Sequence, residues 1–217
     1  YPSQSSPAIH DALLEFDIRT AFKDLSSGLK PTQKQQQEWL RIVFDINNNK
    51  NVLLIAYGQT GSGKTHTLVG KPLEIGLIPI VINEFISNNL ECTCTVMEIY
   101  QDKIYDLLSS NRQELHIMEY NKHLHYKKEP MIRYIKAESD IQECMRIIER
   151  NKTMGCTKIN NTSSRAHTIY FFKCSKTNQE FVAIDLAGNE RGSLSAAKNK
   201  EENREYISIN KSLFALK

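Results

Sequence analysis

The sequence lacks the features that would indicate a membrane, nucleic-acid-binding or secreted protein. Its 217 residues contain no uninterrupted apolar run of the about 18 residues that a membrane span needs, so we expect no membrane partner. A net charge of +3 is too small to predict binding to nucleic acid. The first residues, YPSQSSPAIHDALLEF, lack a basic start followed by a long apolar core, so we expect no secretory signal.

Cysteine is also sparse, and its spacing predicts no metal site or disulfide framework. Two of the five cysteines stand two apart in an expected strand and on one face of it, with no second pair and no suitably spaced histidine: Cys92, Cys94, Cys144, Cys156 and Cys174. Zinc binding or a disulfide is the alternative interpretation. Buried free thiols in a reducing compartment fit the pattern better.

What the sequence does contain is an alternation of strand and helix patterns. Residues 51–57 are apolar almost throughout, which predicts a strand buried on both faces. A helix is expected from about residue 64, and another over 76–90, entered through Pro79. Residues 92–108 predict a strand that ends in a short helical pattern, and 115–128 a hairpin.

The second half continues the alternation. Ser139 and Gln142 have the spacing of a capping box, and the helix after them would have one apolar face, with Ile141, Met145 and Ile148. Strands are expected over 167–175 and 180–188, a loop over 191–205, and a helix from 208 to the end. The order predicts an α/β fold in which helices sandwich a mostly parallel or mixed central sheet.

Directly after the first predicted strand comes a motif that binds phosphate. The string GQTGSGKT matches G-x-x-x-x-G-K-S/T in full. Its glycines let backbone N–H groups converge on phosphate oxygens, the following helix presents its positive end, the lysine reaches the β- and γ-phosphates, and the last hydroxyl binds Mg²⁺. The residues are Gly58, Gln59, Thr60, Gly61, Ser62, Gly63, Lys64 and Thr65.

Two weaker motifs gain meaning beside the first. NNTSSRAH (160–167) taken alone is as readily a solvated turn, and DLAGNE (185–190) places a carboxylate and a free glycine N–H at a strand end. Together the three predict a device that senses a γ-phosphate bound with Mg²⁺. No Asn/Thr-Lys-x-Asp guanine motif is present, so ATP is favoured over GTP.

These strings resemble the kinesin motor domain over nearly the whole chain. FDIRTAF (16–22), AYGQTGSGKTHT (56–67), GLIPI (76–80), EIYQDKIYDLL (98–108) and INKSL (209–213) carry the resemblance together with the two motifs above. It implies a P-loop ATPase, with NNTSSRAH as switch I and DLAGNE as switch II. It implies one motor domain over 1–217 that ends inside the switch II relay helix, incomplete at both ends relative to the family.

The resemblance implies a role for each matching residue. Lys64 and the Gly58–Thr65 backbone would hold the phosphates of ATP or ADP, and Thr65 and Ser164 would bind Mg²⁺, with Asp185 on a metal-bound water. His66 would lie against the base; a plain surface histidine is the alternative. The residues that would surround the γ-phosphate and the attacking water are Asn160, Ser163, Ser164, Arg165, Gly188 and Glu190, of which Arg165 and Glu190 would pair as a latch.

The sequence also departs from the family pattern. Ala166, Asn189 and Ser208 stand where the family has serine, serine and asparagine, and Lys152 where it usually has arginine. The Arg-x-Arg-Pro string of the family's first strand has no match before Phe16.

The implied function is a microtubule-stimulated motor ATPase in the cytoplasm, on microtubules or the spindle. A non-motile, nucleotide-dependent binding or regulatory module is the alternative. Contact with acidic tubulin would use Lys122, Lys127 and Lys128 and the 191–205 loop, which contains Lys198 and Lys200. A solvated basic hairpin edge explains the first three lysines equally well.

Overall fold

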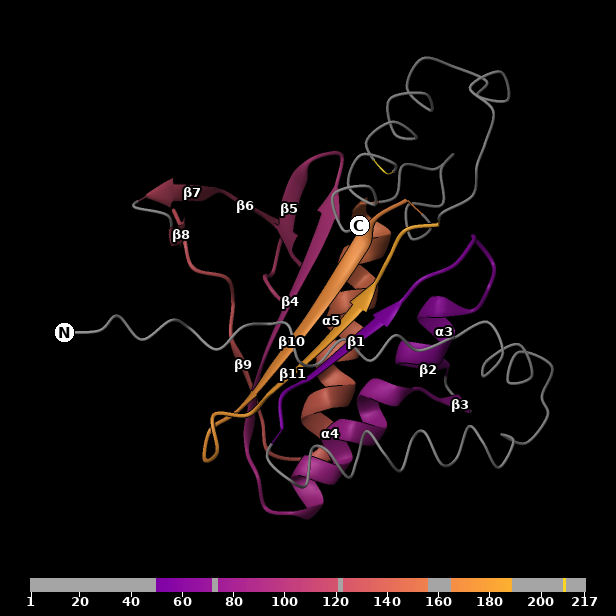
Figure 1. Cartoon of the computed structure of the whole chain (residues 1–217), viewed down its shortest axis with the longest axis vertical. Coiled ribbons are helices and arrows are strands. Elements are labelled where there is room, and N and C mark those ends of the chain that lie inside the picture. Colours follow the sequence, from indigo (N-terminus) through magenta and orange to yellow (C-terminus); the bar gives the residue numbers. More distant parts are fainter. Residues whose placement is uncertain (1–49, 72–73, 121–122, 156–164, 189–208, 210–217) are drawn as a thin grey trace, which may run out of the picture.

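In the described part of the chain, the helices α3 (Lys64–Val69), α4 (Leu77–Ser87) and α5 (Glu138–Gly155) pack on one face of a mixed β-sheet (Figure 1). The computed structural model describes residues 50–71, 74–120, 123–155, 165–188 and 209. Its first strand, β1 (Val52–Ala56), leads into the short helix α3 (Lys64–Val69), the small ribbon β2 (Gly70–Lys71) and β3 (Glu74–Ile75), and α4 (Leu77–Ser87). The helices predicted from residue 64 and over 76–90 are thereby confirmed.

The chain then forms the long strand β4 (Cys92–Tyr100), followed by β5 (Lys103–Asp106) and β6 (Gln113–Leu115). The hairpin of β7 (Ile117–Tyr120) and β8 (His123–Tyr126) confirms the expectation for 115–128. After it come β9 (Arg133–Ile135), α5 (Glu138–Gly155), β10 (His167–Cys174) and β11 (Glu180–Asp185), and the last two confirm the predicted strand pair. In the predicted last helix, Ile209 is helical and the other residues lie outside the described ones, as does the 191–205 segment.

The strands of the main sheet lie in the order β1-β11-β10-β4-β5-β6, and β9 also pairs with β4. Among the described pairs only β1 and β11 run parallel, with Ala56 opposite Asp185. The sheet is therefore of the mixed kind. Its single parallel pair places the carboxyl ends of β1 and β11 side by side, and both ends lead into predicted phosphate motifs.

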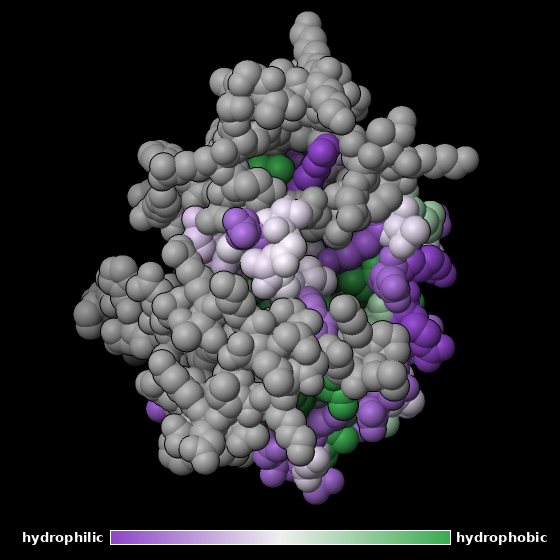
Figure 2. All heavy atoms as spheres, turned by 90° about the vertical axis from the view of Figure 1, so that its right-hand side faces the viewer, coloured by the Kyte–Doolittle hydropathy of each residue, from purple (hydrophilic) through white to green (hydrophobic). Residues whose placement is uncertain are grey.

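The hydrophobic core lies between the sheet and α3, α4 and α5. Alternate residues of β1, β10, β11 and β4 point into it, and so do Cys92 and Cys94, which share one face as expected. In β1 one face is fully buried and the other, with Leu53 and Ile55, is half-buried, so burial on both faces is only partly realised. On the side of the molecule shown in Figure 2, described residues are mostly hydrophilic or neutral, and apolar surface is limited to small areas.

Helix α5 packs as predicted but begins differently. Ile141 and Ile148 are buried and Met145 packs against the core, which confirms the apolar face. The predicted capping box is wrong. The helix begins at Glu138, whose carboxylate accepts a hydrogen bond from the amide of Gln142, and the carboxylate of Asp140 accepts the backbone N–H groups of Lys136 and Ala137.

The predicted helical end of 92–108 is also wrong. Gln101 and Asp102 both have positive φ, 50° and 61°, and they connect β4 to β5 as a two-residue hairpin turn, with Tyr100 paired to Lys103. Such turns usually contain Asn-Gly or Asp-Gly, which makes them recognisable in a sequence. Gln-Asp gives no such signal, and the apolar spacing after it is compatible with a short helix.

Candidate nucleotide site

The candidate site begins with the loop between β1 and α3, residues 57–63. Gly61 and Gly63 have φ of 78° and 90°, a region that favours glycine, and a Cβ built on either would meet no atom within 4 Å. The loop backbone therefore borders open space instead of packing against the protein. Gln59, Thr60, Gly61, Ser62 and Thr65 are exposed. A cradle of this kind suits a ligand that backbone N–H groups bind, such as a phosphate chain.

Lys64 lies across this loop. Its Nζ donates hydrogen bonds to the carbonyl oxygens of Gly58 and Gln59, at 2.8 and 2.9 Å. The side chain is 8% exposed, so a positive charge is held at the inner edge of the cradle. A phosphate oxygen is a stronger partner for an ammonium group than a backbone carbonyl is.

Asp185, at the end of β11, brings the predicted DLAGNE motif to the same place. Its Oδ2 accepts a hydrogen bond of 2.5 Å from the Thr65 hydroxyl, although the two residues are 120 positions apart in the chain. Its Oδ1 is buried and has no hydrogen-bond partner within the described part of the chain. An orphaned carboxylate oxygen beside a hydroxyl is the oxygen-rich setting that Mg²⁺ prefers, so these residues fit the predicted metal.

The electrostatics of Asp185 would favour a cation beside its carboxylate. Burial raises the pKa of this carboxyl above its ordinary value, against the lowering effects of the Thr65 hydrogen bond and the charges of Lys152 and Lys64. A bound divalent cation would stabilise the ionised form.

His167 connects the two predicted switch segments. It is the first residue of β10, directly after Arg165 and Ala166, and its Nδ1 accepts a 3.0 Å hydrogen bond from the N–H of Ala187. Burial lowers the pKa of His167, so the imidazole is neutral with its proton on Nε2. The residue before Gly188 is thereby hydrogen-bonded to the last residue of the predicted switch I motif.

Lys152 is a further charged group near the site whose surroundings the sequence did not reveal. Its Nζ lies 3.4 Å from the hydroxyl of Tyr170 and 5.8 Å from the centre of that ring. Burial lowers the pKa of Lys152, but the neighbouring Tyr170, Asp185 and Glu98 raise it by more, so the amine stays charged. In the sequence, this residue stands out only because the family usually has arginine where Lys152 stands.

The structure places part of the predicted site and leaves part undescribed. Gly58 to His66, Arg165, Asp185 and Gly188 are described; Arg165 and His66 are half-buried and Gly188 is buried. The loop, Asp185 and the start of β10 come together around the ends of β1 and β11. The remaining predicted residues lie outside the described ranges: Asn160, Ser163, Ser164, Glu190 and Lys122.

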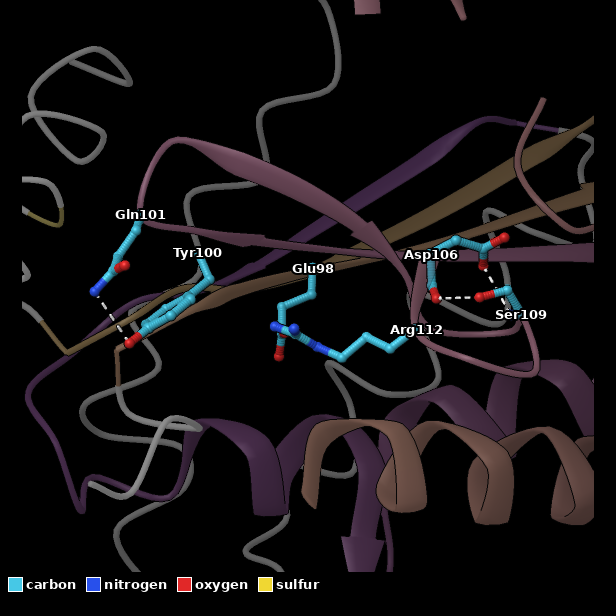
Figure 3. Close-up of polar contacts among 6 residues, drawn as sticks. All are labelled: Glu98, Tyr100, Gln101, Asp106, Ser109 and Arg112. Atoms are coloured by element: carbon cyan, nitrogen blue, oxygen red, sulfur yellow. Dashed lines mark hydrogen bonds and ion pairs between the residues drawn. The ribbon is translucent and has the colours of Figure 1, made fainter. Parts of the chain in front are cut away.

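A second polar cluster, on β4 to β6, was missed by sequence reasoning (Figure 3). Glu98 is buried and forms an ion pair with the half-buried Arg112, whose guanidinium also lies 3.8 Å from the centre of the Tyr105 ring. Nearby, Asp106 accepts backbone N–H groups of the loop that follows it. The string EIYQDKIYDLL carries the family resemblance, but nothing in it marks which of its carboxylates are buried.

No metal-binding group of three or more His, Cys, Asp or Glu side chains occurs among the described residues. The four described cysteines are free and buried, as expected; Cys156 lies outside the described part. Within the described chain, no helix is both long and apolar enough to cross a membrane.

Comparison with known proteins gives a consistent family. A family model, "Kinesin motor domain", matches residues 11–217. The chain is 32% identical over 210 residues to a kinesin heavy chain of Drosophila melanogaster, covering 86% of this chain and 21% of that protein. It is 34% identical over 211 residues to a kinesin heavy chain of Syncephalastrum racemosum, covering 87% and 22%.

Solved structures agree with the sequence comparison. A fast kinesin, studied for its ATPase mechanism and interactions with microtubules, superposes with a TM-score of 0.68 at 29% identity, covering 85% of this chain and 58% of that one. A KIF14 dimer with AMP-PNP in complex with a microtubule gives a TM-score of 0.67 at 25% identity, covering 85% and 59%. The chain thus spans about a fifth of the matched heavy chains and just over half of these motor structures.

Proposed function

Since the chain belongs to the kinesin motor domain family, we propose that it binds and hydrolyses ATP with Mg²⁺ and couples loss of the γ-phosphate to movement on microtubules. The observation that carries the proposal is the hydrogen bond between Thr65 and Asp185. It joins the phosphate loop to the strand end of the switch II motif, with an orphaned carboxylate oxygen beside the contact.

In this proposal the loop and Lys64 hold the phosphates. Lys64 leaves the carbonyls of Gly58 and Gln59 and donates to the β- and γ-phosphates, while the N–H groups around Gly61 and Gly63 face the same oxygens. His66 lies against the base. The open space beside Gly61 and Gly63 supports this proposal, because it leaves room for phosphate oxygens.

Thr65, Ser164 and Asp185 would hold Mg²⁺, Asp185 through a bound water. When bound, the metal neutralises charge that develops on the phosphates. Asn160 and Ser163 would close over the γ-phosphate and Gly188 would donate its N–H to it. Arg165 and Glu190 would pair across the two switches and order the attacking water.

Coupling between the switches is supported by His167. Because Nδ1 of His167 holds the N–H of Ala187, a displacement of the residues around Gly188 is felt at Arg165 and Ala166. Loss of the γ-phosphate can therefore move both segments together.

The partner we propose is the microtubule, and the location the microtubule cytoskeleton, including the spindle. Lys127 and Lys128 are exposed beside the β7–β8 hairpin, where contact with an acidic filament is sterically open. Lys122 and the 191–205 segment, with Lys198 and Lys200, complete the proposed contact.

The experiment that tests the function is the ATP turnover of the chain with and without microtubules. We expect Mg²⁺-dependent turnover that microtubules accelerate. We expect Glu190→Ala to bind nucleotide like the wild type and to have almost no turnover, because the latch acts after binding. Turnover that microtubules leave unchanged would favour the non-motile module, and near-normal turnover of Glu190→Ala would remove the latch.

A further inference from the structure

Four buried thiols gather at the end of the sheet that lies away from the nucleotide site. Cys92 begins β4 and Cys174 ends β10, and the two are directly opposite each other in the antiparallel ladder. Cys94 follows on the same face of β4, and Cys144 of α5 packs against it. The four are free thiols. The proposed ATP hydrolysis uses none of them.

The backbone around Cys174 shows which kind of cross-strand pair this is. Its N–H donates to the carbonyl of Gln179 at 2.8 Å, and its carbonyl accepts the N–H of Asn178 at 3.1 Å. The bond toward β4 is made one residue later, from Ser175 to the carbonyl of Glu91. Cys92 and Cys174 therefore form a non-hydrogen-bonded pair.

In such a pair the side chains approach closely. The Cα atoms are typically about 4.5 Å apart, which is inside the about 4.4–6.8 Å range that a disulfide spans. Both side chains point to the same face, because opposite residues of an antiparallel ladder always do. The two sulfur atoms can therefore be joined without moving either strand far.

The two thiols differ in chemistry. Although burial raises the pKa of Cys174, hydrogen bonds from the Thr177 hydroxyl and from the N–H groups of Thr177 and Lys176, with the Lys176 charge, lower it below its usual value. Burial and the neighbouring Cys174 and Cys144 raise the pKa of Cys92 to about 12. Cys174 is thus suited to attack as a thiolate, and Cys92 stays protonated beside it.

Access to Cys174 depends on the turn that follows it. Cys174 itself is buried, but the next four residues, 175–178, are all exposed. Local opening of this exposed turn would uncover Cys174 to a molecule the size of a peroxide, and Cys94 and Cys144 have no such turn beside them in the described chain.

We propose that Cys174 and Cys92 are a peroxide-sensitive pair that closes into a disulfide between β10 and β4. The Cys174 thiolate attacks one oxygen of hydrogen peroxide, the O–O bond breaks, and sulfenic acid and hydroxide form. The Cys92 sulfur then attacks the sulfenic sulfur while its proton passes to the departing hydroxyl group, which leaves as water. Two thiols lose two electrons, and the peroxide takes them up.

The test is to expose the reduced chain to limiting hydrogen peroxide and to map its disulfides by mass spectrometry of non-reduced peptides. We expect one linkage, Cys92 to Cys174, with the loss of two hydrogen atoms and full reversal by dithiothreitol. A linkage of any other pair, such as Cys94 to Cys144 or one that uses Cys156, would overturn the proposal. So would oxidation to sulfinic acid with no linkage.

A surface variant tests the attacking thiol without disturbing the core. Thr177→Val removes the hydroxyl that stabilises the Cys174 thiolate, and we expect slower disulfide formation with the same final linkage. Thr153→Val, an exposed threonine on α5 remote from this turn, is the matched control and should react like the wild type. An unchanged rate in Thr177→Val would overturn the assignment of Cys174 as a thiol that this hydroxyl activates.

Discussion

At the scale of single residues, Asp185 is the residue on which the proposed chemistry of the site depends most. A buried carboxylate is costly unless hydrogen bonds or a cation compensate for its lost hydration. Asp185 has one such bond, from Thr65, and a second oxygen with no described partner. Burial destabilises the ionised carboxylate, and a bound cation would stabilise it. Carboxylates perturbed in this way are typical of functional sites.

His167 allows a test of the contact between the predicted switch segments. Its folded pKa is lowered by burial, so the unfolded chain, with a pKa of about 6.5, takes up a proton more readily. The free energy of unfolding should therefore be independent of this group above that pH. It should fall as the pH drops through about 6.5 toward the folded pKa.

We expect His167→Asn to flatten this part of the pH profile, because an amide oxygen can replace Nδ1 as acceptor for Ala187 but does not titrate. The measurement is urea unfolding of both proteins between pH 5 and 8, a window chosen around the unfolded histidine pKa of about 6.5. Identical pH slopes in the two proteins would mean that His167 is not the titrating group.

At the scale of elements, the loop between β5 and β6 shows how a local polar network fixes the sheet. Asp106 accepts the N–H groups of Leu108, Ser109 and Met131, at 2.8, 3.2 and 2.7 Å. Asn151 of α5 donates to the carbonyls of Leu107 and Ser109, at 2.8 and 2.7 Å. Together these bonds attach the far edge of the sheet to α5.

Replacing Asp106 with alanine should therefore destabilise the fold. Three backbone N–H groups lose their acceptor, two of them in a buried loop, and we expect a loss of about 3 kcal/mol or more in the free energy of unfolding. Glu129→Ala, at an exposed carboxylate, is the control and should change stability by less than about 0.5 kcal/mol. The comparison is made by urea unfolding; equal effects of the two variants would contradict the network.

The sequence predicted the features that follow general spacing rules and missed those that depend on individual residues. The spacing of Ile141, Met145 and Ile148 and the glycine loop after β1 follow general rules, so both were predictable. The Gln101–Asp102 turn depends on two non-glycine residues with positive φ, and although aspartate tolerates this region, glutamine gives no signal for it. The Glu98–Arg112 ion pair joins residues of β4 and of the loop after β5, and a single sequence does not show such pairing.

At the scale of the whole molecule, the order of motifs predicted the family and the mixed sheet. It could not show that the phosphate loop and Asp185 would be joined through the single parallel pair of strands, β1 and β11. The roles of Asn160, Ser163, Ser164, Arg165, Gly188 and Glu190 stay predictions, as does the single domain over 1–217.

The proposed contact with microtubules depends on positive charge at the protein surface. We expect the double variant Lys127→Glu and Lys128→Glu to weaken co-sedimentation with microtubules, most clearly at low salt, because two attractive charges become repulsive toward acidic tubulin. Lys176→Glu, in the turn between β10 and β11, is the matched charge reversal and should leave binding unchanged. Unchanged binding of the double variant at low salt would assign these lysines to a solvated hairpin edge.

The most direct test of the account is equilibrium binding of ATP and ADP to the purified chain, with Mg²⁺ and with EDTA, for the wild type and Asp185→Asn. We predict tight binding that needs Mg²⁺, and in the variant a loss of metal-dependent affinity of about tenfold or more. Failure to bind either nucleotide, or binding that neither EDTA nor Asp185→Asn weakens, would contradict the claim that the phosphate loop and Asp185 hold one magnesium-bound nucleotide.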